Sequence, residues 1–377
     1  MAIPVELSRV LVDPYWRVRE EKKAGRKIIG VSPMYFPEEI VHASGALPVI
    51  MQEVNLPIVA ARAYIFPNYC GVAVSNVDMA ATGNLDFLDA VVISDICLHI
   101  RTSFGIMDWL MSIPFIYMGW PSYYNMEEWL PFSLRGLERC KEQLQEVTGN
   151  RITDEGIRTS IELYNRNRRL LQQIDSLRRE NPGILRASEM SALVISSMVM
   201  PKEEHNALLE RFIMELERST PVSSGKVRLF LSGQLCSAVR SDVLDLIEES
   251  AGVAVGDDFY AGARYFATEV STSLPPMEAL TKGFYDISVP CPTRIGPEKD
   301  WAEYIITNYH QSQAQGVIFF MNKWCSDLEF MRPDLIKKLT NAGIPHTFLD
   351  TEHEMVSLGG MKTRIGAFVE MLQTKGG

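Results

Sequence analysis

The feature that most constrains the fold is an alternation of short apolar runs with amphipathic segments. KIIGV (27–31), LPVIM (47–51) and DAVVISD (89–95) are almost continuously apolar, which is typical of strands buried on both faces. Helical patterns separate these runs, so successive strands can enter the sheet in the same direction. The alternation predicts a parallel α/β fold whose site lies at the carboxyl ends of the strands.

The pattern changes twice along the chain, which predicts three segments. Residues 1–125 form an N-terminal α/β domain, residues 126–224 have apolar side chains at helical spacing, and residues 225–377 return to the α/β alternation. In the first segment we expect helices over 13–26, 38–45, 78–85 and 103–111, and a strand over 114–121. In the third we expect strands over 227–233, 253–258, 315–321 and 344–350, and helices over 241–252, 332–343 and 361–373.

Composition excludes several classes of function. The formal net charge is −10, and the basic residues of the middle segment alternate with acids, so we expect no nucleic-acid binding. The N-terminus has no signal-peptide pattern and no run is long enough to span a membrane, so we expect a cytoplasmic protein. Neither GxxxxGK[ST] nor a strand–GxGxxG–helix pattern occurs, so this chain is not expected to bind ATP or a dinucleotide through those motifs.

Three of the six cysteines share a position relative to the predicted elements. Cys97 and Cys325 each follow the carboxyl end of an apolar strand, and Cys70 lies in an irregular aromatic segment ahead of the helix around Asp78. Because strand ends of α/β domains converge on a crevice, the three thiols can meet between the two domains. Thiolates favour zinc, copper(I) and iron–sulfur centres.

A second interpretation remains open, because free cysteines are often buried as small hydrophobic residues. No C-x-x-C spacing supports a metal site. Cys140 and Cys291 fit the hydrophobic interpretation, whereas Cys236 also follows a strand and is an outside candidate for the site. The residues alone leave both interpretations in place.

A set of ordered segments resembles the family of 2-hydroxyacyl-CoA dehydratases and benzoyl-CoA reductases. The segments are FPEEIVHASGALPV (36–49), CGVAVSNVDMAATGNLDFLDAVVISDIC (70–97), VAVGDDFYAGARYF (253–266), GVIFFMNKWC (316–325) and IPHTFLDTEHE (344–354), followed by TRIGAFVEML. The resemblance covers nearly the whole chain, and the ordered set is far more specific than any single motif.

The resemblance implies a fold, a cofactor and partners. Family members have flavodoxin-like α/β domains, so we expect two such parallel-sheet domains with an intervening helical block. Each subunit holds a 4Fe-4S cluster on three cysteines, which match Cys70, Cys97 and Cys325 here. The partners implied are a homologous second subunit and an ATP-hydrolysing iron–sulfur activator that delivers single electrons. The substrate implied is an acyl-CoA or aroyl-CoA thioester, reduced through a radical anion.

Within the family, the segments around the first two cysteines favour one branch. QEVNLPIV, NYCG and SDICLHIRTSFGI resemble benzoyl-CoA reductase subunits, in particular the smaller one of the pair, more than dehydratase subunits. We therefore expect an oxidoreductase acting on aromatic acyl-CoA thioesters. The alternatives are a 2-hydroxyacyl-CoA dehydratase (a lyase) and a non-catalytic electron-relay subunit. A zinc protein with the same fold is a more distant alternative.

Four further residues are candidate catalytic groups, each with a structural alternative. Glu38 and His42 lie on one face of the helix after Pro37 and could contact the thioester or supply a proton, or instead stabilise the helix. His99 follows Cys97 and could deliver protons, and Asp258 follows a strand but could equally cap a helix or pair with an arginine.

Such a reduction requires an iron–sulfur cluster with a low reduction potential, and a low reduction potential requires a site that excludes water. Aromatic residues flank two of the cysteines, namely Phe66 and Tyr69 before the first, and Phe320 and Trp324 before the last. We expect these side chains to exclude water from the thiols.

Overall fold

The protein is described by a computed structural model, which covers residues 3–123, 127–219, 225–294, 299–354 and 358–375. Its framework is two four-stranded sheets in which every neighbouring pair of strands is parallel. The first sheet contains β1 (Ile28–Val31), β2 (Leu47–Ile50), β3 (Ala90–Ser94) and β4 (Phe115–Met118). The second contains β5 (Val227–Gly233), β6 (Gly252–Asp257), β7 (Gly316–Asn322) and β8 (His346–Thr351).

The two sheets have the same topology. Their strand orders are β2-β1-β3-β4 and β6-β5-β7-β8, so the chain reverses its direction of winding between β1 and β3 and again between β5 and β7. These two strand pairs are the switch points at which open α/β sheets place ligands. Strands β1, β2, β3, β6 and β7 are buried along their whole length, as their apolar sequences require. The prediction of two parallel-sheet α/β domains is confirmed.

Helices cover both sheets and connect them. The N-terminal ones are α1 (Val5–Ser8), η1 (Arg9–Leu11), α2 (Trp16–Lys23), α3 (Glu38–Ala43), η2 (Ala61–Ala63), α4 (Gly71–Ala81) and α5 (Leu98–Leu110). The middle ones are α6 (Trp129–Thr148), α7 (Asp154–Glu180), α8 (Ala187–Val199) and α9 (Lys202–Arg218). The C-terminal ones are α10 (Ser241–Glu249), α11 (Ala263–Phe266), α12 (Pro276–Tyr285), α13 (Trp301–Gln311), α14 (Ser326–Asn341) and α15 (Gly359–Lys375).

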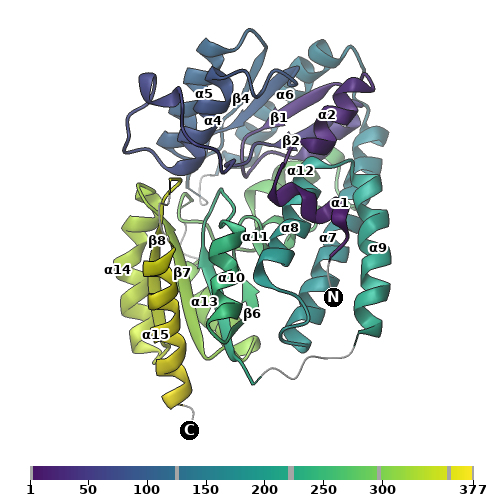
Figure 1. The fold of residues 1–377 in the computed structure, drawn as a ribbon. Helices are drawn as coiled ribbons and strands as arrows, with labels where there is room; N and C mark the ends of the chain where they lie inside the picture. The colour runs from purple at the N-terminus through teal and green to yellow at the C-terminus, as the bar shows by residue number, and fades with distance from the viewer. Residues whose placement is uncertain (1–2, 124–126, 220–224, 295–298, 355–357, 376–377) are drawn as a thin grey trace.

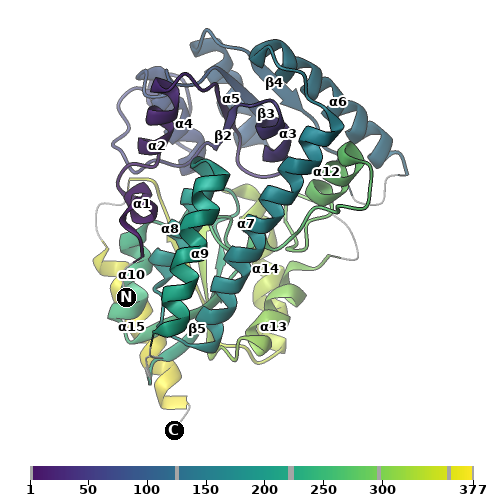
Figure 2. The same cartoon turned by 90° about the vertical axis from the view of Figure 1, so that its right-hand side faces the viewer.

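The middle helices join the two sheets into one packed body. Figure 1 gives the order of the elements, and Figure 2 shows α7 and α9 side by side, running from the first sheet to the second. Helix α7 packs against α3 of the first domain and against α11 and β6 of the second. A single hydrophobic core accordingly contains Val92 of β3 and Phe319 of β7. The strands fall inside the predicted segments 1–125 and 225–377, and α6 to α9 inside 126–224, but the limits of the domains stay predictions.

Three helices begin earlier than the sequence pattern predicts. Helix α4 begins at Gly71 rather than near Asp78, α5 at Leu98 rather than at Ser103, and α14 at Ser326 rather than at Arg332. Each begins at the residue after a cysteine, and cysteine is not among the residues that usually mark a helix N-cap. Cys70 does lie in an irregular segment ahead of the helix that contains Asp78, but that helix begins directly after it.

No helix within the described ranges is long and apolar enough to cross a membrane.

Acidic side chains of α10 dock against the first turn of α8. Asp245 Oδ1 accepts a hydrogen bond from Ser188 Oγ (2.6 Å), and Glu248 Oε1 accepts one from the backbone N–H of Ala187 (3.2 Å). The positive end of the α8 dipole favours these acids. Burial nevertheless raises the pKa of Glu248 to about 7, and within the described residues its other carboxyl oxygen has no hydrogen-bond partner.

A Glu248→Gln substitution is expected to stabilise the protein at high pH. The folded-state pKa of Glu248 lies above the unfolded one, so its contribution to stability is greatest below about pH 4 and is lost as the pH rises through about 7. The variant should gain about 1 kcal/mol over wild type at pH 8 and nothing at pH 4. Urea denaturation at the two pH values measures this, and an equal effect at both would contradict the assignment.

Candidate functional site

Three helix N-termini carry the three predicted cysteines. Cys70, Cys97 and Cys325 are the N-cap residues of α4, α5 and α14. Their side chains close no regular N-cap hydrogen bond. Burial raises the pKa of each thiol, and a backbone N–H from the first turn of each helix opposes part of that rise, because such N–H groups stabilise a negative charge.

The three sulfur atoms are close enough to act on one another electrostatically. Burial raises the pKa of Cys70 well above its ordinary value, and the nearby Cys325 and Cys97 raise it further. Burial likewise raises the pKa of Cys97 to about 11 and that of Cys325 to about 12. These electrostatic couplings link residues that are 255 positions apart in the chain (325 − 70).

Two more cysteines border this group. Cys236 is half-buried beyond the end of β5, and its pKa is raised by burial and by the charges of Cys70, Cys97 and Cys325. Cys291 acts on the pKa of Cys97 and Cys325, although its sequence context suggested nothing beyond core packing. Cys140, in contrast, faces the carbonyl of Tyr117 in the first domain.

Strained backbone surrounds the thiols at the strand tips. Met34 and Tyr35 beyond β1, Gln234 beyond β5 and Trp324 beyond β7 all have positive φ angles, between 44° and 70°. Such conformations are unfavourable for residues other than glycine and concentrate at functional sites. These four residues lie at the carboxyl edge of the sheets, whereas two others with positive φ, Ala251 and Gln313, precede β6 and β7.

His99 links two of the cysteine loops. Its Nδ1 accepts a hydrogen bond from the backbone N–H of Cys70 (3.4 Å), and its ring lies 4.4 Å from that of Tyr69. Burial lowers the pKa of His99, and the nearby Asp327 on α14 opposes this shift. His99 therefore lies beside the thiols, as its sequence position next to Cys97 suggests.

Sequence reasoning missed a contact between Glu53 and His353 that joins the two domains here. His353 Nδ1 lies 3.0 Å from Glu53 Oε1, and Nε2 contacts the carbonyl of Leu56 at 2.8 Å. The Glu53 carboxylate rests on Gly71, at the point where any Cβ would collide with it. Glu53 and His353 both lie in or beside conspicuous sequence segments, but nothing local indicates that they meet.

The predicted aromatic cover of the thiols is only partly correct. Tyr69 and Phe320 are at least partly buried, but Phe66 is 74% exposed and Trp324 48% exposed. Leu98, directly after Cys97, is 68% exposed. Three apolar side chains close in sequence to the cysteines are thus exposed within this chain.

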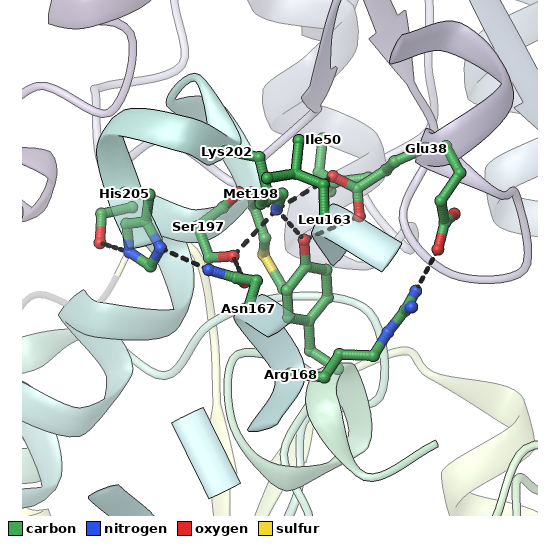
Figure 3. A network of polar contacts seen from close by, with 12 residues as sticks. Glu38, Ile50, Leu163, Asn167, Arg168, Ser197, Met198, Lys202 and His205 are labelled. Carbon is green, nitrogen blue, oxygen red and sulfur yellow. Dashed lines mark hydrogen bonds and ion pairs between the residues drawn. The ribbon is translucent and has the colours of Figure 1, made fainter. Parts of the chain in front are cut away.

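Glu38 lies in a buried polar network with Lys202 and Tyr265. Tyr265 donates a hydrogen bond to Glu38 Oε2 (2.8 Å) and accepts one from Lys202 Nζ (2.9 Å), and Nζ lies 3.7 Å from Glu38 Oε1. Figure 3 shows Lys202 between Glu38 and Ser197, whose carbonyl and hydroxyl oxygens both accept from Nζ. Burial raises the pKa of Glu38 and lowers that of Lys202, and each charge opposes the shift of the other.

A second ion pair and a layer of neutral groups complete the network. Arg168 donates to Glu39 Oε1 (2.6 Å), and both side chains are buried. Figure 3 shows that Asn167 continues the network to His205, whose pKa burial lowers to about 3, so that it stays neutral. The network joins α3, α7, α8, α9 and α11.

His42, the second candidate on α3, makes different contacts. Its Nδ1 lies 2.8 Å from Ser160 Oγ on α7, and its Nε2 lies 3.0 Å from Glu203 Oε1 on α9. These contacts hold α3 to the helical block. His42 is adjacent to the network through the ring of Tyr164, which lies between it and Lys202.

Asp258 is completely buried and bonded to protein groups. Its oxygens accept hydrogen bonds from the Gly233 backbone N–H (3.0 Å), Ser232 Oγ (3.0 Å) and Trp301 Nε1 (2.5 Å). Arg264 Nη2 lies 3.8 Å away, so the expected Asp–Arg pair is present. These contacts fix the tips of β5 and β6.

Three thiols, each at a helix N-terminus, form a donor set of the kind that iron–sulfur centres use. Within the described ranges no three His, Cys, Asp or Glu side chains are arranged to hold one metal ion. The thiolates of a multi-iron cluster bind different iron atoms, so they lie farther apart than the ligands of one ion.

Comparison with known proteins identifies the family. The model of the family "2-hydroxyglutaryl-CoA dehydratase, D-component" matches residues 33–372. The chain belongs to this family.

Curated relatives resemble this chain over almost its full length. The (R)-phenyllactyl-CoA dehydratase beta subunit of Clostridium sporogenes is 29% identical over 94% of each chain. A benzoyl-CoA reductase subunit of Thauera aromatica is 26% identical over 94% of this chain and 93% of its own. The (R)-2-hydroxyglutaryl-CoA dehydratase beta subunit of Acidaminococcus fermentans is 26% identical over 98% and 99%. The family resemblance stated from the sequence is confirmed, and the similar identities leave the reductase and dehydratase branches unseparated.

Replacing Gly71 by alanine is expected to destabilise the protein at the contact between Glu53 and His353. The new Cβ would displace the Glu53 carboxylate and its contact with His353, lowering the free energy of unfolding by about 1–2 kcal/mol. Gly105→Ala on α5 is the matched control, because a Cβ there meets nothing within 4 Å and alanine favours helix. Thermal unfolding of both variants tests this, and equal melting temperatures would contradict it.

Replacing Lys202 by methionine is expected to lower the free energy of unfolding by about 3 kcal/mol, because Glu38 would lose its buried cation. The double variant Lys202→Met with Glu38→Gln should recover at least half of this loss. Lys362→Met, which breaks an exposed pair with Glu249, is the control and should change stability by less than about 0.5 kcal/mol. Urea denaturation at pH 7 measures all three, and a Lys202→Met variant as stable as the control would refute the assignment.

Proposed function

We propose that this chain is the iron–sulfur subunit of an ATP-dependent enzyme that transfers single electrons to an aromatic acyl-CoA thioester. The observation that carries the proposal is the meeting of Cys70, Cys97 and Cys325 at three helix N-termini. Family membership and relatives named for benzoyl-CoA and phenyllactyl-CoA support the substrate class.

A 4Fe-4S cluster on these three thiolates would supply the one-electron chemistry. The chain contributes the surroundings that such a cluster needs. The first-turn N–H groups of α4, α5 and α14 favour the thiolates, and burial keeps the sulfurs largely out of water. His99 holds the Cys70 loop and is our candidate for moving protons beside the thiols.

Apart from His99, the candidate catalytic residues divide by their contacts into one that faces a cavity and two that do not. Glu38 faces a cavity and is held by Lys202 and Tyr265, so we propose that it handles a substrate proton. For His42 and Asp258, whose polar atoms are engaged by protein groups, we propose that they hold α3 and the strand tips in place.

The proposal includes two partners. The exposed apolar rim around the thiols, with Phe66, Leu98 and Trp324, fits the surface of a homologous second subunit. The relatives are named as subunits, which supports a multi-subunit assembly. We assign ATP hydrolysis to a separate iron–sulfur activator, because this sequence lacks the GxxxxGK[ST] motif.

Two reactions fit the proposal, and benzoyl-CoA reductase-type reduction remains our first choice because of the segments around Cys70 and Cys97. The 29% identity to a dehydratase beta subunit favours 2-hydroxyacyl-CoA dehydration as the second candidate. In either complex this chain could instead relay electrons while its partner holds the substrate.

Anaerobic purification is expected to yield about four irons and four sulfides per chain. Cys70→Ser, Cys97→Ser and Cys325→Ser should each lose at least half of the iron, because each removes one of three thiolates. Cys140→Ser is the matched control, since Cys140 is buried elsewhere and should keep the wild-type content. Metal analysis measures this, and zinc or no metal under strict anaerobiosis would refute the proposal.

Counting electrons separates the two reactions in the reconstituted complex. Reduction of an aromatic ring consumes two electrons per product, whereas loss of water from a 2-hydroxyacyl thioester is redox-neutral. With the partner subunit, activator, ATP and a titrated reductant, benzoyl-CoA should consume stoichiometric reductant if the first choice is correct. Turnover of (R)-phenyllactyl-CoA with far less than one electron per product would establish the dehydratase instead.

A further inference from the structure

A fourth thiol, that of Cys236, borders the cysteine site from the tip of β5. Strands β5 and β7 are neighbours in the second sheet, and their register pairs Gly233 with Phe320. Cys236 follows Gly233 and Cys325 follows Phe320, so the two thiols come directly after the carboxyl ends of strands that run about 5 Å apart. The chain reverses its winding between these two strands, which is where parallel α/β sheets form a crevice.

The backbone holds the turn after β5 tightly against β7. Gly233 has a φ angle of 105° and Gln234 one of 44°. A Cβ at Gly233 would lie 2.2 Å from the carbonyl oxygen of Phe320, so only glycine permits this close approach. The backbone N–H of Gln234 donates to the same carbonyl (3.1 Å). The chain therefore turns sharply at the end of β5 and stays in contact with β7.

Buried side chains then fix this turn to β7 and β8. Ser237 Oγ donates to Gln234 Oε1 (2.6 Å) and accepts from Asn322 Nδ2 (2.9 Å). Gln234 Nε2 donates to Thr351 Oγ1 (2.6 Å). The carbonyl of Asn322 accepts the backbone N–H of Cys325 (3.0 Å). Asn322 thus holds the turn and Cys325 at the same time, and the fourth thiol has a fixed position beside the third.

Cys236 also faces the thiols of the first domain. It interacts electrostatically with Cys70, Cys97 and Cys325, and with the carboxylate of Glu53. Cys70, Cys97 and Glu53 belong to the first domain, so the turn after β5 directs its thiol across the crevice between the sheets. Each domain thus contributes two thiols to the same place.

The other two cysteines are engaged by neighbouring oxygen atoms. Cys140 Sγ lies 3.8 Å from the carbonyl of Tyr117, and Cys291 Sγ lies 3.1 Å from Thr293 Oγ1. Among the residues that the structure describes, Cys236 Sγ has no hydrogen-bond partner, and its side chain is half-buried where the other two are buried. Its sulfur is therefore free to bind a further group.

We propose that Cys236 is the fourth thiolate ligand of the cluster for which Cys70, Cys97 and Cys325 are the other three. This inference rests on the function proposed above, which supplies the cluster. A 4Fe-4S cluster has four irons that each take one external ligand, so three thiolates leave one iron open. Binding replaces the S–H bond of Cys236 by an S–Fe bond, and the proton is released to solvent.

Complete ligation by thiolates assigns an electron-relay role to this chain. An iron with four sulfur ligands has no position for a substrate oxygen, so the thioester carbonyl has to be bound and polarised outside this cluster. The fourth thiolate also adds one negative charge, which lowers the reduction potential and favours passing the electron on. One electron arrives from the activator and one leaves, so the chain undergoes no net redox change.

The first test uses the wild-type chain, purified anaerobically from cells grown on iron-57. Mössbauer spectroscopy distinguishes an iron bound only by sulfur from an iron with an oxygen ligand. We expect all iron of the 4Fe-4S cluster in sulfur-only environments. A distinct component holding about a quarter of the iron would overturn the proposal, because it would show one iron without a thiolate.

The second test compares Cys236→Ala with Cys291→Ala, the matched control at a thiol near the same site. Cys236→Ala should keep at least about three quarters of the wild-type iron, because three thiolates remain. Mild oxidation with ferricyanide should then release its unprotected iron and leave a 3Fe-4S cluster, which EPR measures. The EPR signal should be at least about tenfold larger in Cys236→Ala than in wild type or Cys291→Ala.

Equal signals in Cys236→Ala and wild type would overturn the proposal, and so would a large signal in Cys291→Ala alone. The Mössbauer spectrum of the wild type needs no variant, so it decides the question even if Cys236→Ala does not fold.

The same samples separate this inference from the proposed function. A wild-type chain without iron under strict anaerobiosis would overturn the cluster, and with it the function proposed above. A wild-type chain with about four irons, one of them bound to oxygen, would overturn the fourth thiolate alone.

Discussion

The buried charges of Glu38, Glu39, Arg168 and Lys202 set a condition that the rest of the structure must satisfy. Charges removed from water are costly unless each has a partner at close range. Here the partners come from α3 in the first domain and from α7 and α9 in the helical block, with Tyr265 added by the second domain. Separation of the domains would expose or unpair these charges, so the network opposes it and keeps the two sheets in one orientation.

That fixed orientation is what creates the cysteine site. Each domain alone presents the carboxyl ends of a four-stranded parallel sheet, with one cysteine after β3 and another after β7. The first domain adds Cys70 at the start of α4, and the contact of Glu53 with His353 joins the two domains next to it. Three helix N-termini then meet around buried sulfur, an arrangement that neither domain could supply by itself.

The cavity lined by Glu38 and Arg264 lies against the buried network. Tyr260 in its wall is close enough to Cys236 for the two to interact electrostatically, and Cys236 interacts in the same way with Cys70, Cys97 and Cys325. The cavity and the cysteine site are therefore neighbours, and the orientation of the two sheets that the network maintains bears on both.

The sequence by itself determined the strands, the fold class and the family, and it predicts a common site for the three cysteines. Continuous apolar runs such as GVIFFMN can be stable only as buried strands, and the ordered segments around the cysteines are specific to one family. The sequence did not predict that helices begin directly after Cys70, Cys97 and Cys325. Cysteine is not among the residues that usually mark a helix N-cap, so no local signal indicated these starts. Only the tertiary structure decided that Glu53 meets His353, that Lys202 and Tyr265 hold Glu38, and that Phe66 and Trp324 stay exposed. These are contacts between residues remote in sequence, and local periodicity reports which face of an element is buried but not which side chain it is buried against.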